Sequence, residues 1–176
     1  SGQQGFDLDA AMVPLSFSAA EFAPIPTTPI TLGAVGSSRR SGWILPWNST
    51  GTLPEGPSVQ LFTTKLPSNT SVIPRIWWNN RSGLSGDVPW RLTIEPVTSG
   101  DLLSTDLSPL VEVDVLAGAL LNTNRINVTE MVTTPGVPIV IPTHTDLLSI
   151  RVRRRSNLPD DTLDADVTFF CLDLVP

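Results

Sequence analysis

Residues 111–115 read Val-Glu-Val-Asp-Val, and this strict alternation of apolar and acidic side chains decides the fold class. Side chains of a β-strand point to opposite faces in turn, so the three valines belong to a buried face and the two acids to the other face. The same period recurs at 90–95 and at 148–153. Three such runs in one chain predict an all-β protein.

Turn-forming residues separate the apolar runs along the rest of the chain. The sequence holds 17 prolines and 12 glycines in 176 residues, which favours short strands over long helices. Residues 115–122 are interpreted as a loop with at most a short helical turn. Further strands are expected at 42–47, 57–64, 71–78, 123–133, 137–141 and 163–174. Together these strands predict an antiparallel β-sandwich or jelly roll over residues 30–176.

Residues 1–29 show no strand period, and four prolines restrict their backbone. We therefore expect an extended, proline-rich N-terminal arm. Its apolar residues are too numerous for a merely solvated tail. The arm is expected to pack on its own domain or to reach a neighbouring subunit, and Phe6, Phe17 and Phe22 are candidate contact residues.

Charge and hydropathy limit the classes of partner. With 17 acidic and 11 basic residues the net charge is −6, which argues against nucleic acid and anionic lipid as partners. No apolar run approaches the roughly 18 residues of a membrane span. The single cysteine, Cys171, lies in an apolar stretch and is predicted to be an inert buried thiol.

The residue types needed for catalysis and metal binding are scarce. His144 is the only histidine and stands in a polar turn, without a nucleophile motif. One histidine and one cysteine do not supply a zinc site. Four aspartates between 160 and 166 are interpreted as turn formers and solvent-facing positions in preference to a calcium site. We predict a protein that is not an enzyme and has no cofactor and no metal.

Carboxylates also occur within the alternating strands. Glu95, Glu112 and Asp114 alternate with apolar residues, so they are interpreted as outward-facing strand positions. A pair of acids across a cleft, as glycoside hydrolysis requires, is not predicted.

The tryptophans are the most suggestive feature of the sequence, although core packing is the default interpretation for them. Trp77 and Trp78 are adjacent in an expected strand, so they should point to opposite faces and leave one to meet a second layer, the arm or a partner. A basic run either forms forked bonds with acids on a neighbouring subunit or on the same domain, such as Asp160 and Asp161, or is a solvated strand end. This run consists of Arg151, Arg153, Arg154 and Arg155.

A resemblance rests on the C-terminal part of the chain. Residues 148–154, a polar turn and residues 160–167 together resemble the closing pair of strands in small virion-associated proteins of tailed bacteriophages. The resemblance covers residues 148–174 and brings no catalytic residues. It implies a sandwich or jelly-roll module on a head, tail or fibre.

Two functions follow as hypotheses from these observations. The first is a capsid decoration (cement) protein that binds the assembled phage head and bridges neighbouring capsid subunits with its arm and with Trp or Arg contacts. Its expected partners are the major capsid protein and its own copies in a homotrimer, and its expected location is the virion. The alternative is a receptor- or glycan-binding module of a tail appendage, with an exposed tryptophan as a stacking platform.

Overall fold

The computed structural model describes residues 15–25, 30–35, 40–47, 56–102, 108–120, 125–144 and 147–176. Within these ranges the backbone forms twelve strands and one short 3₁₀ helix. In chain order they are β1 (Leu15–Ser18), η1 (Ala19–Glu21), β2 (Ala23–Pro24), β3 (Thr31–Ala34), β4 (Ser41–Leu45), β5 (Ser58–Thr63), β6 (Thr70–Asn80), β7 (Asp87–Val97), β8 (Val111–Gly118), β9 (Asn127–Glu130), β10 (Ile139–Ile141), β11 (Leu147–Arg154) and β12 (Val167–Val175).

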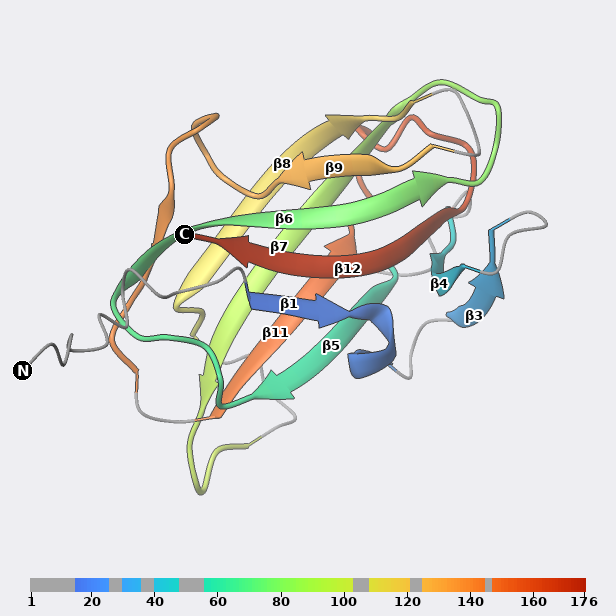
Figure 1. The fold of residues 1–176 in the computed structure, drawn as a ribbon. Coiled ribbons are helices and arrows are strands. Elements are labelled where there is room, and N and C mark those ends of the chain that lie inside the picture. Colours follow the sequence, from blue (N-terminus) through green and yellow to red (C-terminus); the bar gives the residue numbers. More distant parts are fainter. Residues whose placement is uncertain are drawn as a thin grey trace, which may run out of the picture.

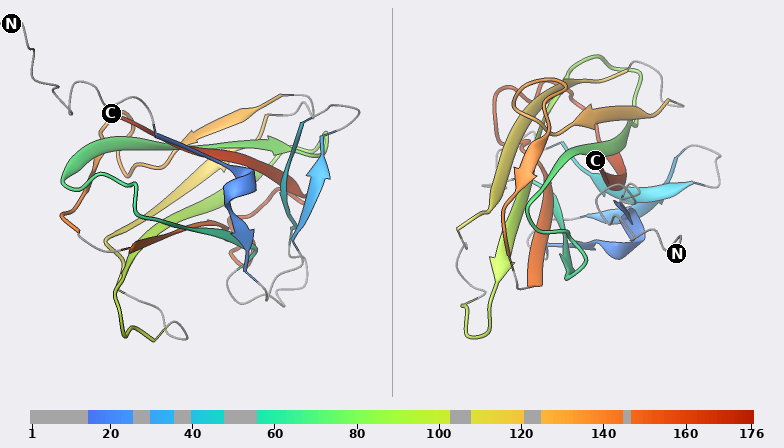
Figure 2. Two further views of the ribbon diagram at one scale, coloured as in Figure 1. Left: turned by 60° about the horizontal axis from the view of Figure 1, so that its bottom comes forward. Right: turned by 60° about the vertical axis from the view of Figure 1, so that its left-hand side comes forward.

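The strands form two antiparallel sheets that face one another (Figures 1 and 2). The seven-stranded sheet has the order β10-β6-β12-β4-β3, with β1 also paired to β12 and β9 also paired to β6. The five-stranded sheet has the order β2-β5-β11-β7-β8. The predicted antiparallel β-sandwich is therefore confirmed.

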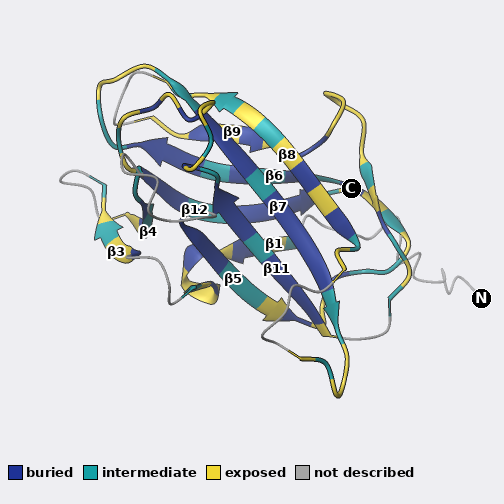
Figure 3. Cartoon of the chain, turned by 180° about the vertical axis from the view of Figure 1, so that it is seen from behind, coloured by how far each residue is buried: buried dark blue, intermediate teal, exposed yellow. Residues whose placement is uncertain are grey.

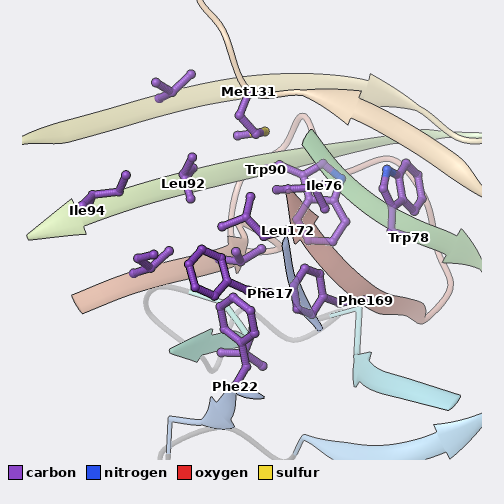
Figure 4. Close-up of a cluster of buried hydrophobic side chains, with 14 of the residues drawn as sticks. Phe17, Phe22, Ile76, Trp78, Trp90, Leu92, Ile94, Met131, Phe169 and Leu172 are labelled. Carbon is purple, nitrogen blue, oxygen red and sulfur yellow. The ribbon is translucent and has the colours of Figure 1, made fainter. Parts of the chain in front are cut away.

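The core lies between the sheets and is filled by the apolar face of each alternating run. Leu92, Ile94 and Ile150 have no exposed surface, and Val113 is 4% exposed. Figure 4 shows aromatic side chains from both sheets meeting in this layer. Trp78 of β6 and Trp90 of β7 pack with ring centroids 5.5 Å apart, which joins the two sheets at one end of the core.

Residues 15–25 of the expected arm belong to the sandwich. β1 pairs with β12 and β2 pairs with β5, so this part of the arm packs on its own domain. Phe17 is 2% exposed and Phe22 is 3% exposed, and the Phe22 ring meets Phe169 edge-on at 5.1 Å. Phe6 and residues 26–29 lie outside the described residues.

The prediction of a loop at 115–122 is wrong for the first four residues, since β8 continues to Gly118. Leu116 pairs with Pro89 and Ala117 with Val88 of β7, so pairing with the neighbouring strand keeps these residues in the extended conformation. Cross-strand pairing overrides the helical preference of leucine and alanine in this stretch. Residues 121–122 lie outside the described part of the chain.

Arg154 at the end of β11 is the largest charged side chain in the core. Its side chain and that of Asp161 are both fully buried, and they form the forked pair expected from the sequence, with N···O distances of 2.7 and 2.9 Å. Its remaining donors bond the carbonyls of Leu45, Leu163 and Ala165 at 2.6–3.2 Å. All five N–H groups of the guanidinium are thus used.

The backbone of Arg154 also requires a glycine beside it. Gly56 has φ +77°, and a Cβ at this position would lie 2.1 Å from the Arg154 carbonyl oxygen. Only glycine combines this conformation with such a close approach. The chain therefore reaches β5 through a turn that is fitted to the end of β11.

Removal of the carboxylate from this pair should destabilise the whole sandwich. In Asp161→Ala the guanidinium stays buried without its counter-charge, and we expect the free energy of unfolding to fall by about 3–5 kcal/mol. Urea denaturation followed by tryptophan fluorescence measures this change. The control is Arg155→Ala, whose partner Asp114 is 45% exposed and whose loss should cost under about 1 kcal/mol. Equal small losses in both variants would contradict the assigned role of Arg154.

Candidate functional site

An open hollow lies at the edge of the sandwich where the two sheets part. β2 pairs with β5 only at Val59 and Gln60. The residues that come just before β2 in the chain form the 3₁₀ helix η1. The last part of β5 therefore extends beyond its partner. A hollow of about 260 Å³ opens there between β1, η1, β5 and the start of β11. Its lining residues are Phe17, Glu21, Leu61, Phe62, Thr63, Thr64, Lys65 and Leu147.

The floor of this edge hollow is apolar and its rim carries an exposed aromatic ring. Phe17 and Leu61 face the core side of their strands. Phe62, the next residue along β5, points to the opposite face because side chains alternate, and it is 44% exposed. Leu147 stands beside it and is 36% exposed. A large exposed aromatic face next to an apolar floor can pack against the apolar face of a sugar ring.

Charged side chains of both signs complete the rim. Glu21 is exposed, and its Oε2 accepts a hydrogen bond of 2.9 Å from the Ser18 backbone N–H, which orients the carboxylate. Lys65 is exposed and is the only lysine of the chain. Its backbone N–H donates to Thr63 Oγ1 at 3.0 Å, which shapes the turn after β5. A carboxylate accepts hydrogen bonds and an ammonium donates them, so the rim matches ligand hydroxyls in both roles.

The outer face of the five-stranded sheet carries a network of ion pairs. Arg91 forms a forked pair with Asp114 at 2.6 and 2.7 Å, and Arg155 reaches the same carboxylate at 3.0 Å. The hydrogen bonds from Arg91 hold the pKa of Asp114 below its usual range. Arg151 pairs with Glu95 at 2.5 Å. Figure 3 views the molecule from this side, with the middle of β11 and β7 buried.

Glu95 differs from the solvated position that its place in the sequence suggests. It points outward, as expected, yet it is only 7% exposed. Glu112 and Asp114, in contrast, are exposed on the outer strand β8. The difference arises because Glu95 lies on β7 inside the sheet, where the Arg151 side chain covers it.

A second candidate surface lies on the outer face of the seven-stranded sheet. Trp77 is partly exposed there, and the Arg75 guanidinium stands over its ring at 5.3 Å. Arg75 is fixed by a forked pair with Asp173 at 2.7 and 2.9 Å. Val128, opposite Trp77 on β9, is 45% exposed. We call these residues the Trp77 face.

Cys171 borders the Trp77 face and is half-buried, so it is more accessible than its apolar surroundings suggest. Its sulfur lies 3.1 Å from the Ser16 hydroxyl. Burial raises the pKa of this thiol above its usual value, which keeps it protonated and unreactive at neutral pH.

The structure separates the interface candidates that the sequence suggested. Phe17, Phe22, Trp78 and Arg154 are core residues, and Trp78 Nε1 donates to Thr129 Oγ1 at 2.9 Å. Trp77 points to the surface, as the adjacent-residue argument predicts. The outward-facing arginines 151, 153 and 155 all lie on the outer face of the five-stranded sheet or at its end, with Arg153 only 7% exposed.

The edge hollow is not among the sites that the sequence predicts. Leu61 and Phe62 are adjacent apolar residues in a strand, so one of them has to face outward, by the same rule that separates Trp77 from Trp78. That signal was present at Phe62. The contributions of Glu21 and Lys65 had no comparable signal because they come together only through the pairing of β2 with β5.

The described residues show neither a metal cluster nor a membrane helix. No group of three or more histidine, cysteine, aspartate and glutamate side chains among them is placed to hold a metal ion. Of the Asp160–Asp166 cluster, Asp161 bonds Arg154 and Asp166 accepts the Trp47 backbone N–H at 3.2 Å. In the part of the chain that is described, no helix has the length and apolar character needed to cross a membrane.

No family model and no curated protein sequence matches this chain. Solved structures do match its fold. The Podospora anserina GH26-CBM35 β-(1,4)-mannanase aligns with a TM-score of 0.54 at 9% identity, over 93% of this chain and 27% of the enzyme. The chain thus spans about a quarter of that protein.

Two isolated modules are matched over almost their whole length. The CBM36-1 domain of a multidomain xylanase from the hindgut metagenome of Trinervitermes trinervoides gives a TM-score of 0.51 at 8% identity, over 93% of this chain and 98% of the module. The CBM22-1 xylan-binding domain from Paenibacillus barcinonensis Xyn10C gives 0.51 at 12% identity, over 92% and 93%. At these identities the similarity shows a shared β-sandwich fold, one that carbohydrate-binding modules use.

Proposed function

We propose that this chain is a non-catalytic glycan-binding module and that the edge hollow is its binding site. The observation that carries the proposal is the combination of the exposed Phe62 ring with Glu21 and Lys65 around one apolar floor. Sugars present both an apolar ring face and hydroxyls that donate and accept hydrogen bonds. A site for them needs an aromatic platform and a few polar groups of both kinds.

The fold supports this proposal. Modules named for carbohydrate binding or xylan binding share the sandwich over more than 90% of their length. Because fold alone does not determine function, the residues of the hollow carry the proposal. The volume of about 260 Å³ is small for a drug-sized ligand and fits a single sugar ring.

Removal of the aromatic platform should weaken glycan binding without unfolding the domain. Phe62 is 44% exposed, so Phe62→Ala leaves the core intact. We expect about a tenfold loss of affinity, which corresponds to about 1.4 kcal/mol. The measurement is calorimetric titration with the best binder from a panel of gluco-, xylo-, manno- and galacto-oligosaccharides.

Trp77→Ala serves as the matched control, because it removes an aromatic side chain from the opposite sheet. Its affinity should equal that of the unmodified chain. Loss of binding in Trp77→Ala with full binding in Phe62→Ala would move the site to the Trp77 face. Absence of binding to every saccharide in the panel would overturn the proposed function.

A second candidate is a virion protein that decorates an assembled capsid, with capsid subunits and its own copies as partners. The Trp77 face favours it, because tryptophan and arginine are enriched at the centres of protein interfaces. Val128 adds an exposed apolar residue to that face. Such a protein stabilises the shell by binding the assembled state in preference to free subunits.

The copy number of the chain per virion tests this second candidate. Quantitative mass spectrometry of purified particles compares it with the major capsid protein and the portal. A number similar to that of the capsid protein is expected for decoration. A number near that of the portal points to a tail appendage, and absence from particles rules out a virion role.

A further inference from the structure

A row of side chains leads from the edge hollow across the five-stranded sheet. Phe62 of β5 lies directly opposite Ser149 of β11, and Ser149 lies directly opposite Glu95 of β7. Opposite residues in an antiparallel pair point to the same face and are about 5 Å apart. Phe62, Ser149 and Glu95 therefore form a line that starts at the rim of the hollow and runs across three strands.

The far end of this row is held rigid by an ion pair. The Arg151 side chain is 16% exposed and bonds Glu95, whose side chain is 9% exposed. Arg151 belongs to the next row, between Gln60 of β5 and Thr93 of β7. Because both members of the pair are fixed, they hold hydrogen-bonding groups in place with little entropy left to lose when a ligand binds.

The middle of the row is a short hydroxyl side chain between longer ones. Ser149 is 7% exposed, although it faces outward, because it stands between Phe62 and the Glu95–Arg151 pair. A chain of sugars that enters the hollow over Phe62 meets the Ser149 hydroxyl next and the ion pair after it. Strand spacing is about 5 Å, close to the length of one pyranose residue along a glycan.

We propose that Ser149, Glu95 and Arg151 form a second subsite, which takes the next residue of an uncharged oligosaccharide whose first residue occupies the edge hollow. This inference rests on the proposed function. The ligand is uncharged because each subsite holds one cation and one anion, Lys65 with Glu21 and Arg151 with Glu95. Neither subsite offers the net positive charge that would favour a uronic acid.

The test compares affinity with chain length. Calorimetric titrations use the mono-, di- and trisaccharide of the neutral series that binds best in the panel, and galacturonic acid with its dimer as the charged probe. We expect the unmodified chain to bind the neutral disaccharide about tenfold more tightly than the monosaccharide, a gain of about 1.4 kcal/mol. The neutral disaccharide should also bind more tightly than the charged one.

Two variants remove the second subsite while leaving the hollow intact. In Ser149→Ala and in Arg151→Gln the affinity for the monosaccharide should stay unchanged and the gain on lengthening should fall to threefold or less. Arg151→Gln leaves Glu95 buried without its partner, so the unfolding midpoint of this variant is measured as well. If Arg151→Gln does not fold, the result for Ser149→Ala decides the test. Arg91→Gln, on the same face but away from the row, is the control and should keep the full gain.

The outcomes separate this inference from the function on which it rests. Monosaccharide binding that depends on Phe62, without a gain for the disaccharide or with a gain that both variants retain, would overturn the second subsite alone. Preference for the galacturonic acid dimer would also overturn it. Failure of every saccharide to bind would overturn the proposed function together with the subsite.

Discussion

The buried contact between Arg154 and Asp161 is the constraint on which the rest of the sandwich depends. A guanidinium without exposed surface is tolerated only because all five of its N–H groups are bonded. Three of its acceptors are carbonyls on other segments, Leu45 in β4 and Leu163 and Ala165 before β12. One side chain from the five-stranded sheet thereby holds β4 and the segment that leads into β12.

The edge hollow lies at the other end of β11 from this contact, since Leu147 begins the strand and Arg154 ends it. β11 pairs with β5, and β12 pairs with β1. The hollow lies between β1 and β5, so its width depends on how β11 and β12 are held relative to one another. Phe17 closes its floor from β1, and the chain then turns away at η1, which leaves Phe62 uncovered. The proposed site is therefore open because β2 covers only part of the edge of β5.

Alternation predicted the sheet faces well and could have predicted more. Leu148, Ile150 and Val152 are every second residue of β11 and face the core. The same alternation predicts that Arg154 faces the core. The adjacent pair Leu61-Phe62 likewise requires one outward-facing apolar residue. In contrast, Glu21 and Lys65 line the same hollow because β2 pairs with β5, and no local pattern specifies this long-range pairing. Phe17 and Phe22 look like arm residues in sequence for the same reason.

The single lysine permits a direct test of the claim that glycans bind at the edge hollow. Lys65 is labelled by reductive methylation with ¹³C-formaldehyde, and its methyl resonance is followed during titration with the best-binding neutral saccharide. The account predicts a saturable shift of the Lys65 signal with the same dissociation constant as calorimetry. Saturable binding by calorimetry that leaves the Lys65 signal unmoved would contradict it.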